Sequence, residues 1–160
     1  MDTYWGKYGL DVYYTSDGAI EEEGGNIKII GRADDVMKVA GHRMSTAEME
    51  DAITRHPNVA ECAVVSKQDE IKGEVPVAFV ILKDREPSEE MKKEIKKTTD
   101  EHIGPFARPH DIYFVEDVPK TRSGKIMRRI LKNLLRGKDL GNITTIKNPE
   151  SVEKLKEIIS

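Results

Sequence analysis

Two runs of apolar residues in the middle of the chain predict its central strands. Val59–Ser66 contains the continuous triplet Ala63-Val64-Val65, and Val75–Leu82 is almost entirely apolar. Short runs of this kind, bounded by turn residues, are typical of buried strands. Ile112–Val115 predicts a third strand of the same sheet. The polar, Gly-containing stretch Lys67–Glu74 is expected to be a loop.

Apolar residues at helical spacing predict four helices around these strands. Three of the four begin at Ser, Pro or Asn residues that favour a helix start, and the first of these is a capping box ending in Glu48. The predicted helices run from Ser45 to the residue before Pro57, from Pro87 to about His102, from Ile126 onward, and from Asn148 to Ile159.

Two short hairpins are predicted ahead of the first helix. The first pairs Val12–Thr15 with Asn26–Ile30 across the acidic, Gly-rich turn Glu21–Gly25. The second joins Val36–Val39 to His42–Met44 around a Gly-containing turn. The predicted fold class is therefore α+β: a small three-stranded sheet with packed helices plus N-terminal β-hairpins.

Composition excludes several functions. The chain has 160 residues and a net charge of -3, so it can bury a core but has no general attraction to nucleic acid. Its single cysteine, Cys62, excludes an intrachain disulfide and favours a cytoplasmic location. The four histidines lack the spacing of paired metal ligands, so no metal site is expected. No apolar run is long enough to cross a membrane, so no membrane partner is expected.

The segment from Lys120 to Lys138 is strongly basic, with eight Lys or Arg residues and no acid. Lys125 lies where this loop is expected to become a helix, a position that suits a phosphate or carboxylate. A solvated basic face fits the same pattern. A nucleic-acid surface is the third alternative, but no aromatic residue is interleaved to stack bases. A P-loop is excluded, because Ile126 follows Lys125 and Pro119 stands where the first Gly should be.

Three motifs occur in a fixed order along the chain: Tyr14–Gly18, Gly31–Arg43 and Pro119–Arg129. Together they resemble the C-terminal end of the AMP-forming acyl-CoA synthetases, in the adenylate-forming superfamily that includes luciferase and peptide-synthetase adenylation domains. The residue sequence of the third motif is most similar to that of the acetyl-CoA synthetase branch. The resemblance implies that residues 1–34 are the end of a large N-terminal domain with its hinge, and that residues 35–160 are a mobile C-terminal domain.

The resemblance also implies roles for single residues. Asp17 and Arg32 are expected to meet the ribose of the nucleotide, and Asp34 is expected to be the hinge. Lys125 matches the adenylation lysine, which would bridge the acyl carboxylate and the α-phosphate.

A second face of the same domain is implied for the second step. After rotation about the hinge, the hairpin Gly41-His42-Arg43 is expected to replace the adenylation lysine. Gly41 and His42 would bind CoA, and Arg43 would meet the phosphate of AMP. One departure concerns the CoA nucleotide: Asp100 stands where acetyl-CoA synthetases tend to place an arginine, with Lys96 and Lys97 a turn earlier.

The implied reaction has two steps. A carboxylic acid and ATP with Mg²⁺ give an acyl-adenylate and pyrophosphate, and the thiol of CoA then releases AMP. The large N-terminal domain is not found in these 160 residues, so the chain alone is expected to be inactive and to bind none of these molecules tightly. That domain and the substrates are the expected partners, together with a lysine acyltransferase or deacylase acting on Lys125. The alternative is a non-catalytic partner-binding or regulatory module of the same fold.

Overall fold

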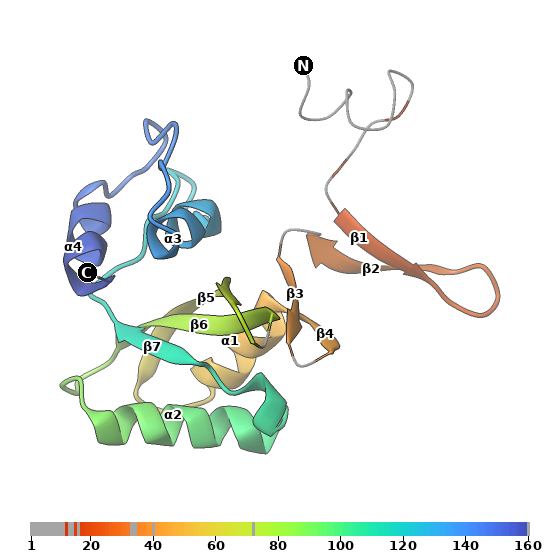
Figure 1. Cartoon of the computed structure of the whole chain (residues 1–160), viewed down its shortest axis with the longest axis horizontal. Helices are drawn as coiled ribbons and strands as arrows, with labels where there is room; N and C mark the ends of the chain where they lie inside the picture. The colour runs from red at the N-terminus through yellow and green to blue at the C-terminus, as the bar shows by residue number, and fades with distance from the viewer. Residues whose placement is uncertain are drawn as a thin grey trace. The chain divides into compact units, whose positions relative to one another are not determined.

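The computed structural model describes Val12, Thr15 and residues 17–32, 35–39, 41–71 and 73–159 (Figure 1). The chain divides into two compact units, Met1–Val36 and Met37–Ser160.

The first unit contains an antiparallel hairpin of β1 (Asp17–Glu21) and β2 (Ile27–Arg32). The first strand was expected at Val12–Thr15, and this prediction is wrong: neither Val12 nor Thr15 lies in a strand, while Tyr13 and Tyr14 fall outside the described residues. The turn explains the difference. Gly24 and Gly25 there have φ of 102° and 82°, so the turn rather than the apolar pattern sets which residues pair.

The second unit is built on a five-stranded sheet with the order β4-β3-β6-β5 and β7 beside β6. Of the two strands expected to be central, β6 is central, but β5 lies at an edge, so the prediction for β5 is wrong. The strands are β3 (Val36–Val39), β4 (His42–Ser45), β5 (Val59–Asp69), β6 (Gly73–Leu82) and β7 (Asp111–Phe114).

Three strands of this sheet were expected, and the other two are the predicted second hairpin. That hairpin joins the sheet where Val39 lies opposite Gly73. β5 and β6 also run into the stretch expected to be a loop, since their pairing continues to Asp69 opposite Gly73. Backbone hydrogen bonds do not require apolar side chains, so the polar ends of both strands remain paired.

The helices are α1 (Thr46–Thr54), α2 (Glu89–His102), the short 3₁₀ helix η1 (Pro105–Ala107), α3 (Arg128–Leu135) and α4 (Glu150–Ile159). The predicted starts of α1 and α2 are confirmed by their caps. Ser45 Oγ accepts from Glu48 N–H at 3.2 Å, and Ser88 Oγ accepts from Met91 N–H at 3.1 Å.

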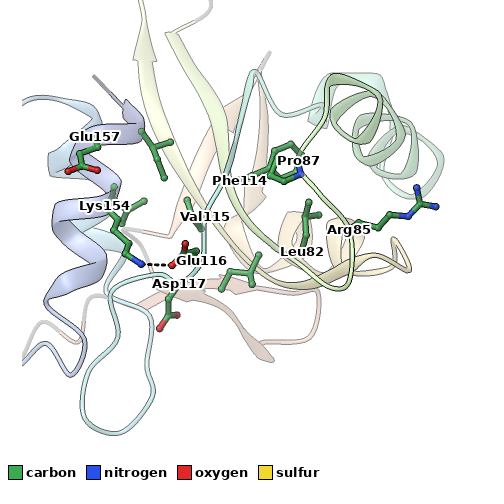
Figure 2. Close-up of a pocket in the computed structure, with 12 residues that line it drawn as sticks. Leu82, Arg85, Pro87, Phe114, Val115, Glu116, Asp117, Lys154 and Glu157 are labelled. Atoms are coloured by element: carbon green, nitrogen blue, oxygen red, sulfur yellow. Dashed lines mark hydrogen bonds and ion pairs between the residues drawn. The ribbon is translucent and has the colours of Figure 1, made fainter.

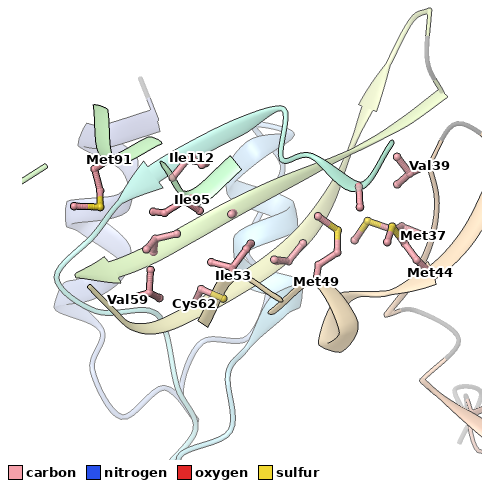
Figure 3. Packing of buried hydrophobic residues seen from close by; sticks show 14 residues of the cluster. Met37, Val39, Met44, Met49, Ile53, Val59, Cys62, Met91, Ile95 and Ile112 are labelled. Carbon is pink, nitrogen blue, oxygen red and sulfur yellow. The ribbon is translucent and has the colours of Figure 1, made fainter. Parts of the chain in front are cut away.

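Both faces of the sheet are covered by helices, which explains the continuous apolar runs in β5 and β6 even though β5 is an edge strand. Ala78 and Val80 of β6 face a cluster formed with α1 and α2 (Figure 3). The alternate residues Val77 and Phe79 face a second cluster with Leu131 of α3 and Leu155 of α4. The second unit is thus a three-layer body with α1 and α2 on one face and α3 and α4 on the other. Within the described ranges, no helix has both the length and the apolar character needed to cross a bilayer.

Candidate functional site

Lys125 lies in a tight hairpin loop between β7 and α3. Thr121 N–H donates to Lys125 O at 2.8 Å, and Lys125 N–H donates to Thr121 Oγ1 at 3.1 Å. Gly124 completes the turn with φ of 84°, a conformation that L side chains rarely adopt. Met127 N–H donates to Pro119 O at 2.8 Å and closes the base of the loop. The backbone is therefore fixed on both sides of Lys125.

The side chain of Lys125 is exposed, and no hydrogen bond or ion pair joins its Nζ to any described residue. The prediction that Lys125 lies at the start of a helix is wrong. Ile126 forms an antiparallel bridge with Lys120, which extends the hairpin, and α3 begins only at Arg128. Lys125 can therefore attract an anion through its own ammonium, without help from a helix N-terminus.

Lys120 ties the incoming side of this loop to the body of the unit. Its Nζ lies 2.7 Å from Glu61 Oε2 on β5 and 3.1 Å from Asp117 Oδ1. Asn148 reinforces the same point: its Oδ1 accepts from Lys120 N–H at 3.0 Å, and its Nδ2 donates to Asp117 Oδ2 at 2.8 Å. The loop thus begins at a closed network of two acids, one lysine and one amide.

The contacts of this network shift the pKa values of Asp117 and Lys120. Burial raises the pKa of Asp117, but hydrogen bonds from Lys120 Nζ, from Val118 N–H and from Asn148 outweigh that effect and hold the pKa below its ordinary 3.8. Burial likewise lowers the pKa of Lys120, yet Glu61 and Asp117 raise it above its ordinary 10.5.

Asp117→Asn is expected to reduce the stability of the chain at neutral pH and to flatten its acid dependence. A carboxylate with a lowered pKa contributes stability above its unfolded pKa and loses it as pH falls through the folded value. Lys120 stays charged throughout this range. The free energy of unfolding of wild type and variant would be measured in urea between pH 7 and pH 2.5. The difference between the two free energies should shrink below about pH 4. A difference that does not vary with pH would rule out this linkage.

Arg128 ties the outgoing side of the loop to α1 and β5. Its Nε lies 3.1 Å from Glu50 Oε1, and its second contact, NH2 to Glu50 Oε2, is 2.6 Å. Glu50 Oε1 also accepts from Val64 N–H at 2.8 Å. The two side chains are only 19% and 15% exposed, so this pair is largely withdrawn from solvent. The neighbouring Cys62 thiol is buried, which raises its pKa and leaves it protonated.

The hairpin between β3 and β4 forms a second exposed feature of the same unit. Gly41 has φ of 86°, and a Cβ built there would meet no atom of the described part of the chain within 4 Å. His42 and Arg43 follow it and are exposed. The ring of His42 stacks on Phe106 of η1 with centroids 4.5 Å apart. Phe106 in turn folds over Gly104, where a Cβ would lie 3.1 Å from the ring.

The remaining predicted site residues lie in or next to the first unit. Asp17 is exposed and opens β1 opposite Arg32, and its N–H donates to Thr15 Oγ1 at 3.2 Å. The side chain of Arg32 and the whole of Asp34 fall outside the described residues. Within the second unit, the structure therefore places Lys125 and the Gly41–Arg43 hairpin on one body.

Sequence reasoning missed the acids that hold the Lys125 loop. For Glu50 a signal existed: it follows buried Met49 and precedes buried Ile53 by three positions, so a charged residue lies within the inward stripe of α1. Sequence reasoning also missed the partner of Asp100. Its carboxylate pairs with Arg108, with 3.2 Å between Arg108 Nε and Asp100 Oδ1. The guanidinium of Arg108 therefore lies beside the carboxylate at position 100.

A cavity of about 640 Å³ lies between α4 and the ends of β6 and β7 (Figure 2). Lys154 of α4 reaches Glu116 across it with an ion pair. Asp117 is the one lining residue that also belongs to the Lys120 network. None of the predicted site residues that the structure describes lines this cavity.

Known proteins are similar to the part of the chain that contains these features. Residues 48–125 match the family described as AMP-binding enzyme C-terminal domain. The chain is 51% identical over 158 residues to acetyl-coenzyme A synthetase of Pyrobaculum arsenaticum, covering 98% of this chain and 23% of that protein. It is 44% identical over 165 residues to propionate--CoA ligase of Salmonella typhimurium, covering 99% and 26%. The chain thus spans about a quarter of the length of these curated relatives, and it corresponds to their C-terminal part.

Solved structures share the fold. Acetoacetyl-CoA synthetase from Streptomyces lividans gives a TM-score of 0.78 at 24% identity, covering 99% of this chain and 24% of that one. The anthranilate CoA ligase AuaEII in complex with anthranoyl-AMP gives a TM-score of 0.64 at 37% identity, covering 76% and 24%.

Proposed function

We propose that this chain is the C-terminal part of an AMP-forming acyl-CoA synthetase acting on acetate, because residues 48–125 match the family described as AMP-binding enzyme C-terminal domain. The full enzyme would convert a carboxylate, ATP and CoA into acyl-CoA, AMP and pyrophosphate through an acyl-adenylate. One observation carries the proposal: the exposed Lys125 ammonium, which has no partner among the described residues, stands on a loop with a fixed backbone. The acetate preference rests on similarity to acetyl-coenzyme A synthetases at 51% identity.

In the first step, Lys125 would bridge the attacking carboxylate and the α-phosphate. Both groups are negative, so they repel one another until a cation lies between them. The ammonium offsets the charge that gathers as the phosphorus gains its fifth oxygen. This is positioning and electrostatic stabilisation, with no proton transferred by Lys125.

In the second step, the second unit would turn about Asp34 and present the β3–β4 hairpin instead. Gly41 leaves an open space where a side chain would stand, which suits the passage of the pantetheine arm of CoA. His42 would contact CoA, and Arg43 would meet the phosphate of AMP. A rotation about one hinge between two faces of a rigid lobe is a familiar mode of domain motion.

The nucleotide would be held largely by the missing domain, with Asp17 and Arg32 at its ribose and Mg²⁺ bound with ATP. Residues 1–34 would complete that large domain, and residues 35–160 would be the mobile part. For the CoA nucleotide, the candidate cations are Lys96, Lys97 and Arg108, the last of which pairs with Asp100. Lys96 Nζ donates to His110 O at 3.2 Å, which places it on the same side of α2 as Arg108.

Lys125 is also a suitable target for a lysine acyltransferase, with a deacylase to reverse the reaction. Its amine is exposed and has no partner among the described residues, so an acyl donor would meet no competing ion pair. Acylation would remove the positive charge that the first step needs.

The proposal is tested by complementation. This chain would be mixed with the large domain of an acetyl-CoA synthetase that lacks its own C-terminal part, and acetyl-CoA formation would be measured. The mixture should be active although each part alone is inactive. Inactivity of the mixture, with binding of the two parts demonstrated, would favour the non-catalytic module instead.

A further inference from the structure

We propose that Glu50 and Glu61 are positioning residues for Lys125, acting through Arg128 and Lys120. The inference rests on the proposed function of Lys125 and deepens it. Lys120 and Arg128 flank the loop on either side, with seven residues between them. Each forms an ion pair with an acid from the body of the unit, so the loop is held at both ends.

The two acids come from elements that are distant in sequence from the loop. Glu61 lies 59 positions before Lys120 on β5, and Glu50 lies 78 positions before Arg128 on α1. Both bonds are short, at 2.7 Å for Lys120 Nζ and 2.6 Å for Arg128 NH2. Charge-assisted bonds of this length are among the stronger hydrogen bonds in proteins. The loop is therefore fastened to the three-layer body itself.

The Glu50–Arg128 pair fixes direction as well as distance. Two parallel N–H···O bonds hold the planar guanidinium in the plane of the carboxylate, which a lysine could not do. Glu50 is fixed in its turn, because Oε1 also accepts from Val64 N–H in the edge strand β5. Arg128 is the first residue of α3, three positions after Lys125. The orientation of the catalytic ammonium is thereby linked to the sheet.

Stability alone does not require such a pair. A partly buried ion pair can often be replaced by apolar residues without loss of stability, because desolvation offsets much of the attraction. Catalysis by positioning is more demanding, since a misplacement of about 1 Å can cost about 100-fold in rate. The ionic anchors are accordingly assigned to the placement of Lys125.

Hydrogen exchange on this chain tests the anchoring without any catalysis. The amides of Thr121, Lys125 and Met127 report the loop, because each donates a hydrogen bond within it. In Glu50→Gln, their exchange should become about tenfold faster relative to amides of the β5–β6 ladder. Lys154→Gln removes an ion pair of α4 outside the loop and should leave the ratio unchanged.

Rates in the complemented enzyme test the consequence for chemistry. Glu50→Gln and Glu61→Gln should each lower kcat for acyl-adenylate formation about tenfold or more, with KM for the carboxylic acid and the rate from supplied acyl-adenylate unchanged. Lys154→Gln should leave both steps unchanged. The proposed function is judged separately, by the effect of removing Lys125 itself.

A double variant separates positioning from folding. Glu50→Gln/Arg128→Met removes both charges, so it should recover much of the stability that Glu50→Gln loses. Its loop amides should still exchange fast and its adenylation should stay slow. If adenylation and loop protection instead return with stability, or if neither changes in Glu50→Gln, the positioning role is overturned.

Discussion

Lys125→Ala should abolish formation of the acyl-adenylate and leave the conversion of supplied acyl-adenylate to acyl-CoA intact. The ammonium is exposed and has no hydrogen-bond or ion-pair partner in the described part of the chain, so its removal should cost the fold little. It would remove the cation placed between two anions in the first step. Loss of one such electrostatic contact costs about 100- to 1,000-fold in rate.

The two half-reactions are measured separately in the complemented enzyme. Exchange of pyrophosphate into ATP reports adenylation, and acyl-CoA formed from added acyl-adenylate reports the second step. Lys138→Ala is the matched control, an exposed lysine of the same basic segment. Equal loss of both half-reactions in Lys125→Ala would contradict the assigned role.

Gly41→Leu is expected to give the opposite result, with thioester formation strongly reduced and adenylation retained. A Cβ at Gly41 meets no atom of the described residues within 4 Å, so the new side chain would extend outward into the proposed path of the pantetheine arm. The φ of 86° adds backbone strain of about 1 kcal/mol, which the unit should tolerate. We expect thioester formation to fall about 100-fold, as for other misplacements at a reacting centre.

Gly24→Leu controls for the strain. Gly24 has φ of 102° and equally open surroundings, but it lies in the β1–β2 turn of the first unit. The Gly24→Leu variant should retain both half-reactions. If Gly24→Leu and Gly41→Leu lose thioester formation alike, strain and not obstruction would be responsible.

The elements that follow from burial could be predicted from the sequence. The apolar runs of β5 and β6 locate both strands, and the caps of α1 and α2 locate the starts of these helices. The polar ends of β5 and β6 could not be predicted, because backbone pairing holds them without apolar side chains. The first hairpin could not be predicted in the same way. Ile27 and Ile29 of β2 are more than 70% exposed, so its apolar pattern does not report a buried face, and its register follows from the glycines of the turn.

In the candidate site, too, the local features could be predicted from the sequence and the long-range contacts could not. Lys125 is identified by a local motif of eleven residues, from Pro119 to Arg129, because the loop's shape depends on neighbours in sequence. The helix predicted to start at Ile126 begins later, since the hairpin bridge between Ile126 and Lys120 continues the loop. The anchors Glu50 and Glu61 depend on contacts across 78 and 59 positions, and such contacts become visible only in the folded chain.

The claim that one lobe serves two steps through two faces is tested most directly by one ratio. The rate of pyrophosphate exchange, divided by the rate of acyl-CoA formation from supplied acyl-adenylate, is measured for Lys125→Ala and for Gly41→Leu in the complemented enzyme. The ratio should fall by about 100-fold in the first variant and rise by about as much in the second. A ratio that moves in the same direction in both variants, or in neither, would contradict the division of the two steps between the Lys125 loop and the β3–β4 hairpin.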